Sequence, residues 1–433
     1  MLRPDKTAHY SALFILIAGV TAVGLMIPRH HGWMLLFAYF SAFLGYFWYC
    51  RQEISWLELL VVGLGLRLAL FLQMPSLSDD IFRFIWDGQL VANGISPYAN
   101  LPSALKLSGL EGIDPALFNE LNSPEYYSVY PPLNQLIFWL GHFGESYLTK
   151  TNLLRAILLV GELASLLALS TLLKDNPSRN RKLSLFFLNP LLILEVCGNL
   201  HFEGLVISFL LLGFLFLKQD KLVATGISVG LAIGTKLVPI IFLPALVFKY
   251  WFRKGLIISG IAAMILLMSF IPFLNESTIS GMQSSLDLYF RNFEFNASVY
   301  FLAREIGYWI TGYNMIHIIG PMLSMATFAS IMAVVFWGLK KRWSVEIICL
   351  FSLSLYLLLA TTVHPWYVLP LMALGILSGY YYPLVWTGII FVTYFGYTEN
   401  GYELSPLWIV LEYVIVLAAF GIENFKKNHA TDL

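Results

Sequence analysis

The stretch LSDDIFRFIWDGQLVANGISPY, residues 77–98, brings three carboxylates and an arginine together in a mostly apolar chain. Ser78 can cap a helix that starts at Asp79. At roughly 100° per residue, such a helix carries Asp79, Asp80, Arg83 and Asp87 within about a quarter of its circumference. The spacing predicts an amphipathic helix at the membrane interface, with its polar stripe facing a cavity.

Two interpretations of this stripe are open. Acids stabilise helix N-termini, and Arg83 can pair with Asp79 or Asp87 four residues away, so the stripe can be purely structural. However, a cap needs one acceptor only, and clustered ionisable groups near a membrane often mark functional sites. Adjacent acids also push their pKa values apart, and a carboxylate held near neutrality can take a proton from a hydroxyl. The functional interpretation is general base catalysis by Asp79 or Asp80.

Further polar side chains stand where apolar runs end. In CGNLHFEG, His201 and Glu203 lie two residues apart at a predicted span boundary. A lone histidine there is more often a satisfied interfacial residue, but the nearby carboxylate leaves a substrate site open. In HPWY, Pro365 can turn His364 toward a cavity beside Trp366, although interfacial aromatic belts also contain such residues.

Two cations are candidates for binding an anionic substrate group. Lys236 lies between two apolar runs in IGTKLVPIIFLP, where it either snorkels to the interface or meets a phosphate. Arg291 lies in a polar segment, where surface pairing with Glu294 or Asp287 is the alternative to substrate binding.

The elements that must position these residues are membrane spans. Of the 433 residues 58% are hydrophobic and 12% are charged, and apolar runs long enough to cross a bilayer recur throughout. We expect an all-α polytopic membrane protein with about 12–14 transmembrane helices and one integral membrane domain over residues 1–433. Most Lys and Arg then fall in inner loops, which leaves two long outer loops at 74–149 and 274–314.

Several classes of chemistry lack their sequence signals. The chain contains no P-loop, GxSxG or HExxH motif. Its three cysteines are scattered over apolar runs and show no zinc-ligand spacing. The net charge of zero gives no sign of a nucleic-acid surface. We therefore predict no metal site and no cofactor.

From these motifs the chain resembles the GT-C glycosyltransferases, and within them bacterial mannosyltransferase-like proteins with an acidic motif in the first large outer loop. The resemblance runs in order through SDDIFRFIWDG, YPPLNQ, NPLLILEVCGNLHFEG, TKLVPIIFLP, FNASVY and HPWYVLP. It implies a GT-C-like helical bundle, a polyprenyl-phosphate sugar donor and inversion at the anomeric carbon. It also implies that Asp80 or Asp79 is the base, with Asp80 preferred here.

The resulting hypothesis is an inverting hexosyltransferase of the inner (cytoplasmic) membrane that transfers mannose to an acceptor hydroxyl on the periplasmic side. The substrate-binding set is Arg83, Asp87, His201, Glu203, Lys236, Arg291, His364 and Trp366. The expected partners are the lipid-linked donor, a glycan, lipid or protein acceptor and the bilayer, with no nucleic acid. The alternative is a transporter or flippase for a glycolipid or small polar substrate, which predicts acids inside broken spans and an inverted repeat.

Overall fold

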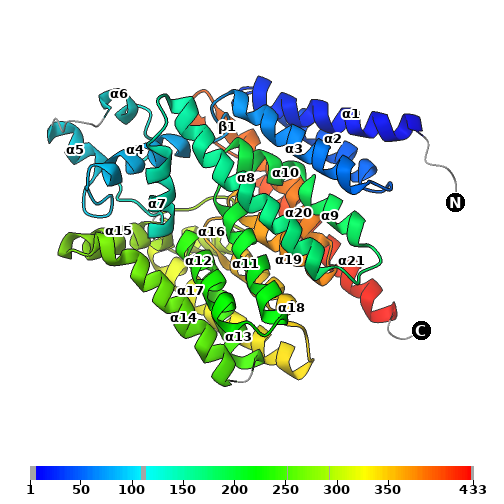
Figure 1. Ribbon diagram of the computed structural model, residues 1–433. Helices are drawn as coiled ribbons and strands as arrows, with labels where there is room; N and C mark the ends of the chain where they lie inside the picture. Colours follow the sequence, from blue (N-terminus) through cyan, green and yellow to red (C-terminus); the bar gives the residue numbers. More distant parts are fainter. Residues whose placement is uncertain (1–5, 109–113, 251, 292, 431–433) are drawn as a thin grey trace. The chain divides into compact units, whose positions relative to one another are not determined.

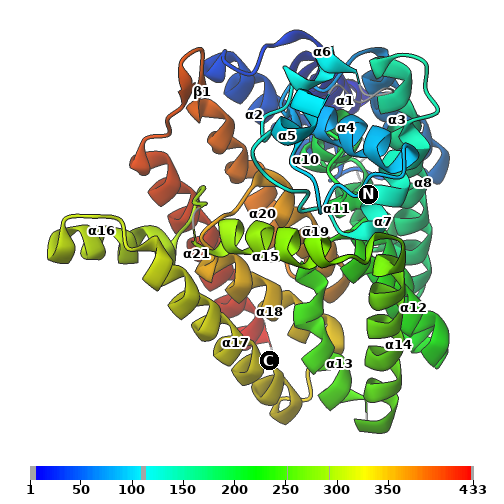
Figure 2. The ribbon, with the colours of Figure 1, turned by 90° about the vertical axis from the view of Figure 1, so that its left-hand side faces the viewer.

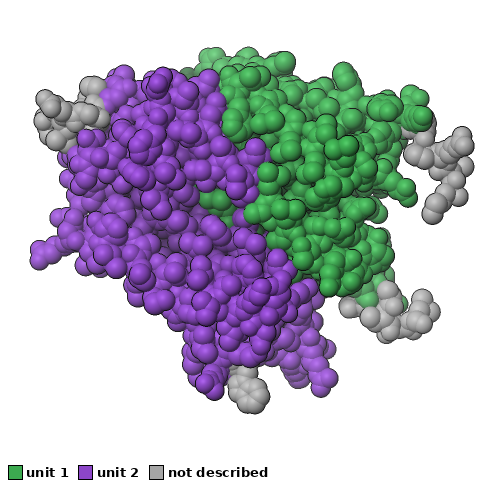
Figure 3. Space-filling model, in the orientation of Figure 1, with its two compact units in different colours: residues 1–77, 162–207, 364–433 green, residues 78–161, 208–363 purple. Residues whose placement is uncertain are grey.

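The computed structural model describes residues 6–108, 114–250, 252–291 and 293–430, and its described part is almost entirely helical (Figure 1). The chain forms two compact units, shown in different colours in Figure 3. Unit 1 contains residues 1–77, 162–207 and 364–433, and unit 2 contains residues 78–161 and 208–363. The all-α prediction is confirmed, because the β structure of the described residues is limited to one two-stranded hairpin and an isolated bridge between Phe295 and Thr362.

Unit 1 is built from three separate parts of the chain. Its elements are α1 (Lys6–Thr21), η1 (Ala22–Met26), α2 (Gly32–Tyr49), α3 (Trp56–Ala69), η2 (Leu70–Leu72), α9 (Arg179–Phe187), α10 (Pro190–Leu192), η3 (Ile193–Gly198), η6 (Pro365–Tyr367), α19 (Val368–Ser378), α20 (Tyr382–Ile389), η7 (Ile390–Gly396), β1 (Tyr397–Thr398), β2 (Gly401–Tyr402) and α21 (Pro406–Ala430).

Unit 2 holds the predicted loop regions and several long helices. Its elements are α4 (Asp80–Ala92), α5 (Pro102–Ser108), α6 (Pro115–Phe118), α7 (Pro132–Gly141), α12 (Leu222–Thr235), η4 (Val238–Phe242), α13 (Leu243–Lys249), α14 (Phe252–Phe270), η5 (Ile271–Phe273), α15 (Glu276–Arg291), α16 (Val299–Thr311), α17 (Ile316–Lys340) and α18 (Val345–Leu359). Two further helices, α8 (Tyr147–Leu172) and α11 (Glu203–Lys218), contribute to both units.

Among the described residues, five helical segments are long and apolar enough to cross a membrane: Lys6–Met26, Tyr147–Leu172, Phe252–Phe273, Ile316–Lys340 and Pro406–Lys427. A sixth is the pair Pro190–Gly198 and Glu203–Lys218, which is bent by 113° at its break. The prediction of about 12–14 transmembrane helices is larger because it also counts shorter apolar segments. The structure forms such segments as helices of 10–17 residues, for example Leu222–Thr235 and Val345–Leu359.

Close backbone packing fixes the helices of unit 2. In α12, Gly226 and Gly230 face α14, and a Cβ on Gly226 would lie 3.0 Å from the carbonyl oxygen of Ile258. This small-residue spacing allows the two helices to approach closely. In the same way, a Cβ on Gly88 of α4 would lie 2.3 Å from the carbonyl oxygen of Phe138 in α7. The α4 backbone is therefore seated directly on α7.

Both predicted loop regions are folded. Residues 74–149 contain α4 to α7, and α4 is the amphipathic helix expected there. Residues 274–314 contain α15 and α16, and α15 runs across the direction of α14 (Figure 2).

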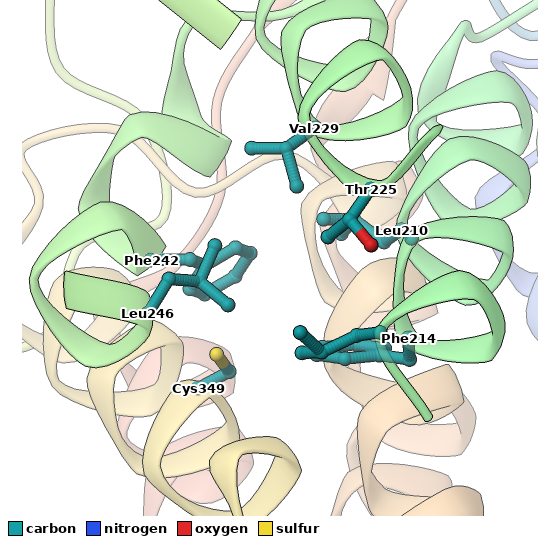
Figure 4. A pocket seen from close by; sticks show the side chains of 9 residues that line it. Leu210, Phe214, Thr225, Val229, Phe242, Leu246 and Cys349 are labelled. Carbon is teal, nitrogen blue, oxygen red and sulfur yellow. The ribbon is translucent and has the colours of Figure 1, made fainter. Parts of the chain in front are cut away.

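Unit 2 also contains a small apolar cavity between α11, α12, α13 and α18. Leu210, Phe214, Val229, Phe242 and Leu246 point into it (Figure 4). Its volume of about 10 Å³ is close to that of a single water-sized probe. The cavity is therefore too small for a sugar.

Candidate active site

The first turn of α4 carries the acidic pair. The helix starts at Asp80, and Asp79 occupies the N-cap position, one residue later than the sequence predicted. The Ser78 hydroxyl oxygen accepts a hydrogen bond from the Asp80 backbone N–H at 3.3 Å, so Ser78 does satisfy a donor at this helix end. The pair is thus held at the positive end of the helix dipole.

The Asp80 carboxylate has two side-chain donors. Asn122 Nδ2 donates to Asp80 Oδ1 at 3.0 Å, and the Tyr130 hydroxyl donates to Oδ2 at 3.2 Å. Burial raises the pKa of Asp80, and the charge of Asp79 adds to this; the bond from Asn122, the positive charge of Lys236 and the bond from Tyr130 offset part of the rise. A half-buried carboxylate with a raised pKa has the environment that a general base requires.

Arg83 and Asp87 form a buried ion pair one turn further along α4. Arg83 Nε donates to Asp87 Oδ1 at 2.8 Å, and the two side chains are 4% and 0% exposed. This confirms the sequence-based pairing of Arg83 with Asp87. Asp87 Oδ2 also accepts hydrogen bonds from the Ser128 hydroxyl at 2.6 Å and from Gln135 Nε2 at 3.1 Å.

The guanidinium of Arg83 also binds the backbone of the segment that follows α6. Arg83 Nη1 donates to the carbonyl oxygens of Ser123 at 3.2 Å and Tyr126 at 2.9 Å. This segment carries both Asn122 and Tyr130, the donors to Asp80. The ion pair therefore fixes the loop that completes the surroundings of the carboxylate.

Lys236 follows α12 with an extended backbone and precedes the short helix η4. The residue before it is tied to α7, because Asn134 Nδ2 donates to the Thr235 carbonyl oxygen at 2.9 Å. The half-buried Lys236 side chain lowers the pKa of Asp80 through its positive charge. Lys236 is therefore a predicted substrate residue of unit 2 whose charge acts directly on the Asp80 carboxylate.

In unit 1, His201 and Glu203 stand at the break of the bent pair of helices. Both are buried, and Glu203 begins α11. Leu200 beside them adopts φ = 62°, a left-handed conformation that branched residues of this kind rarely adopt. Such local strain at a break in a helix is common at functional sites.

A buried carboxylate lies at the centre of this part of unit 1. Glu195 accepts a hydrogen bond from the Tyr394 hydroxyl at 2.7 Å and from Asn199 Nδ2 at 3.2 Å. His201 Nε2 is 3.4 Å from Glu195 Oε2. The cluster joins two parts of the chain that are almost 200 residues apart.

His364 and Trp366 belong to the same cluster. The Trp366 ring is stacked on His201 with ring centroids 3.4 Å apart and on His364 with centroids 4.5 Å apart. His364 occupies the N-cap position of η6, and Pro365 opens that helix. The structure therefore stacks the rings of His201, Trp366 and His364 on one another within unit 1, and the buried Glu203 lies two residues after His201.

Arg291 ends α15, and its side chain lies outside the described residues. Of its two predicted alternative partners, Asp287 also has a side chain outside the described residues, and Glu294 accepts a hydrogen bond from Arg304 Nη1 at 2.7 Å.

Sequence reasoning missed five residues of these two clusters: Asn122, Tyr130, Glu195, Asn199 and Tyr394. Tyr130 begins YPPLNQ and Glu195 lies in NPLLILEVCGNLHFEG, so the motifs of the resemblance contained them without indicating a role. Among residues 6–108, 114–250, 252–291 and 293–430, no group of three or more His, Cys, Asp or Glu is arranged to hold a metal ion.

The described chain contains several helices that are long enough to cross a membrane. It also presents a carboxylate, Asp80, that lies on a separate short helix and accepts hydrogen bonds from two side chains. These features define a polytopic all-α membrane protein with a candidate general base. The chain belongs to the family described as "Alpha-(1->6)-mannopyranosyltransferase, N-terminal domain", whose model matches residues 6–252. The resemblance to GT-C mannosyltransferase-like proteins is thereby confirmed.

A similar relative is alpha-(1->6)-mannopyranosyltransferase A of Mycobacterium tuberculosis (strain ATCC 25618 / H37Rv). The chain is 29% identical to it over 188 residues, which cover 42% of this chain and 35% of the relative. The match thus spans about a third of the length of that relative.

Proposed function

We propose that the protein is an inverting mannosyltransferase that moves mannose from a polyprenyl-phosphate-linked donor to an acceptor hydroxyl. We place it in the cytoplasmic membrane with the site facing the periplasm. The observation that carries the proposal is the Asp80 carboxylate, half-buried beside Lys236 and held by Asn122 and Tyr130. Membership of a mannopyranosyltransferase family supports the class of reaction and the sugar.

In the proposed step, Asp80 takes the proton of the acceptor hydroxyl. The hydroxyl oxygen forms the new glycosidic bond at the anomeric carbon, while the bond from that carbon to the phosphate oxygen breaks. Polyprenyl phosphate leaves with the bonding electron pair, so atoms and charge balance. The family description contains an α-(1→6) linkage, and an α product formed with inversion requires a β-linked donor.

The surroundings of Asp80 suit this step. Partial burial raises its pKa and makes the carboxylate a stronger base, while the bonds from Asn122 and Tyr130 favour its ionised form and offset part of the rise. Lys236 is the proposed partner of the donor phosphate, because an ammonium stabilises the charge that develops on the leaving group.

The other predicted substrate residues receive different proposed roles. Arg83 and Asp87 are buried in their own ion pair, so we propose that they position the loop of Asn122 and Tyr130 without direct contact to substrate. For His201, Glu203, His364, Trp366 and Arg291 we retain substrate binding as the proposal.

A transporter or flippase remains the alternative. It predicts that the functional acids lie inside broken spans. Glu203 does lie at the break of the bent pair, but Asp79 and Asp80 lie at the start of α4, which is separate from the membrane-length helices and from the bent pair. The family match also favours a transferase.

The test is mannose transfer from radiolabelled polyprenyl-phosphate mannose by membranes that contain the wild type, Asp80→Asn or Asp79→Asn. Because a general base contributes about 10²–10⁴-fold to a rate, we expect Asp80→Asn to lose at least about 10²-fold and Asp79→Asn far less. The matched control is Asp114→Asn, since Asp114 caps α6 and asparagine caps equally well.

Gel filtration in detergent establishes that each variant is folded. A folded Asp80→Asn protein that transfers mannose within a few fold of the wild type would refute the role of Asp80. Absence of transfer by the wild type, combined with movement of a labelled glycolipid across vesicles, would support the transporter instead.

A further inference from the structure

Unit 2 contains a groove of about 630 Å³. One wall comes from residues 91–105, from the last turn of α4 to the first turn of α5, and the other from residues 272–275, which directly precede α15. This volume is within the usual range for small-molecule sites, roughly 300–1,000 Å³. The groove is distinct from the surroundings of Asp80, because it lies at the other end of α4.

The chemistry of the lining residues excludes some ligands. Ser96, Asn100 and Asn275 supply hydroxyl and amide groups, and Pro272 and Phe273 supply apolar surface. None of the described residues that line the groove is charged. A phosphate or a carboxylate would lack a counter-charge there, whereas a neutral polyol finds both hydrogen-bonding groups and an apolar face.

Two amides retain complementary hydrogen-bonding groups. Asn275 Oδ1 accepts from the Thr278 backbone N–H at 2.7 Å and from its hydroxyl at 2.9 Å, so the Nδ2 donor remains for a ligand. Asn100 Nδ2 donates to the Ser96 carbonyl oxygen at 3.0 Å, so its Oδ1 acceptor remains. A sugar hydroxyl both donates and accepts, which matches this combination.

The two walls of the groove are fixed to each other. Ser96 Oγ lies 3.4 Å from Thr278 Oγ1. A Cβ on Gly281 would lie only 1.9 Å from the Tyr98 carbonyl oxygen, so α15 contacts the opposite wall backbone to backbone. The groove is therefore preformed, which reduces the entropy lost when a ligand binds.

Tyr98 connects the groove to the candidate base. Its ring packs edge-on against Phe273 in the groove wall, with centroids 5.3 Å apart. Its hydroxyl donates to the Tyr130 carbonyl oxygen at 2.6 Å, and the Tyr130 hydroxyl binds Asp80. Along α4, Asp80 and Val91 are eleven residues apart, or about 16 Å at 1.5 Å per residue.

We propose that this groove binds the neutral oligosaccharide part of an extended acceptor, remote from the hydroxyl that reacts at Asp80. The inference rests on the proposed function for the identity of the reacting end. Because about 16 Å of helix separates the two places, a long acceptor occupies both and a single sugar occupies only the site at Asp80.

The test compares two variants of groove residues with a control variant at a nearby position outside the groove. Phe273→Ala removes the apolar face, and Asn275→Asp removes the Nδ2 donor but keeps the oxygen that caps α15. Ile279→Ala is the matched control, because Ile279 is 58% exposed on the same helix and does not line the groove. All three are measured in the full-length protein in detergent.

The first measurement is equilibrium binding of a neutral linear manno-oligosaccharide without donor, by calorimetry or saturation-transfer NMR. We expect each groove variant to weaken binding about tenfold or more and Ile279→Ala to leave it unchanged. The second measurement is transfer, in which the groove variants raise KM for the long acceptor, leave kcat unchanged and leave KM for a simple mannoside unchanged.

Equal binding by the wild type and both groove variants, or no binding by the wild type, would overturn the inference. Asp80→Asn separates the two proposals, since it should retain oligosaccharide binding while it loses transfer. Groove-dependent binding without any mannose transfer by the wild type would refute the proposed reaction and still support the groove as an oligosaccharide site.

Discussion

Replacing Tyr130 by phenylalanine tests how the protein controls the ionisation of Asp80. The change removes the hydroxyl that donates to Asp80 Oδ2 at 3.2 Å. It keeps the ring, which packs edge-on against Phe84 and Phe138. The variant therefore removes one hydrogen bond and little packing.

The size and sign of the effect follow from this bond. A hydrogen bond to a charged group contributes about 1.5–3 kcal/mol, and one pKa unit corresponds to about 1.4 kcal/mol. Because Asp80 is only half-buried and the bond is long, we take the lower end, about one unit. The bond favours the ionised carboxylate, so its loss raises the pKa of Asp80 further.

The assay is the pH dependence of kcat/KM for mannose transfer. The acid limb of the Tyr130→Phe profile should move about one unit to higher pH, while the rates converge with those of the wild type well above both pKa values. Tyr300→Phe is the matched control, because it removes a phenol from a different carboxylate, Glu294. An unchanged acid limb in a folded Tyr130→Phe protein would refute this account of Asp80.

Three further predictions concern the Arg83–Asp87 ion pair, the groove wall at Gly281 and Asp80 itself. Arg83→Met leaves Asp87 buried without its cation, which costs about 3–5 kcal/mol, so the midpoint of thermal unfolding in detergent should fall clearly below that of the wild type. Gly281→Ala places a methyl group against the Tyr98 carbonyl oxygen and should weaken oligosaccharide binding while kcat stays unchanged. Because folding raises the pKa of Asp80, the contribution of this carboxyl group to stability is full below its unfolded pKa of 3.8 and is lost as the pH rises through the folded pKa. The unfolding midpoint of Asp80→Asn minus that of the wild type should therefore increase from acidic to neutral pH. A difference that stays constant with pH would contradict this.

Local patterns predicted the fold class and the main helices. The amphipathic spacing predicted α4 to within one residue, and the i,i+4 rule predicted the pair of Arg83 and Asp87. Apolar runs predicted the five long spans to within a few residues. The predicted number of spans also includes the shorter apolar helices, because hydropathy reports burial and does not distinguish lipid from a protein interior.

The partners of the carboxylates could not be predicted from local patterns. Asn122 and Tyr130 are 42 and 50 residues from Asp80 in sequence, and their donors reach it only because the loop after α6 folds back onto α4. Glu195 lies in a segment that is otherwise apolar, and its partner Tyr394 is 199 residues away. Such contacts depend on tertiary packing, for which a single sequence gives no spacing rule.

The two carboxylates Asp80 and Asp87 lie on one face of α4 but in different environments. Asp87 is fully buried, and Arg83, Ser128 and Gln135 all donate to it, so it has no capacity left for a substrate. Asp80, two turns earlier, is half-buried and has a raised pKa. Different environments on a single helix thus separate a structural carboxylate from the proposed base. The cluster of charges in this apolar chain therefore has two functions: Asp87 holds the loop in place, and the loop in turn adjusts the basicity of Asp80.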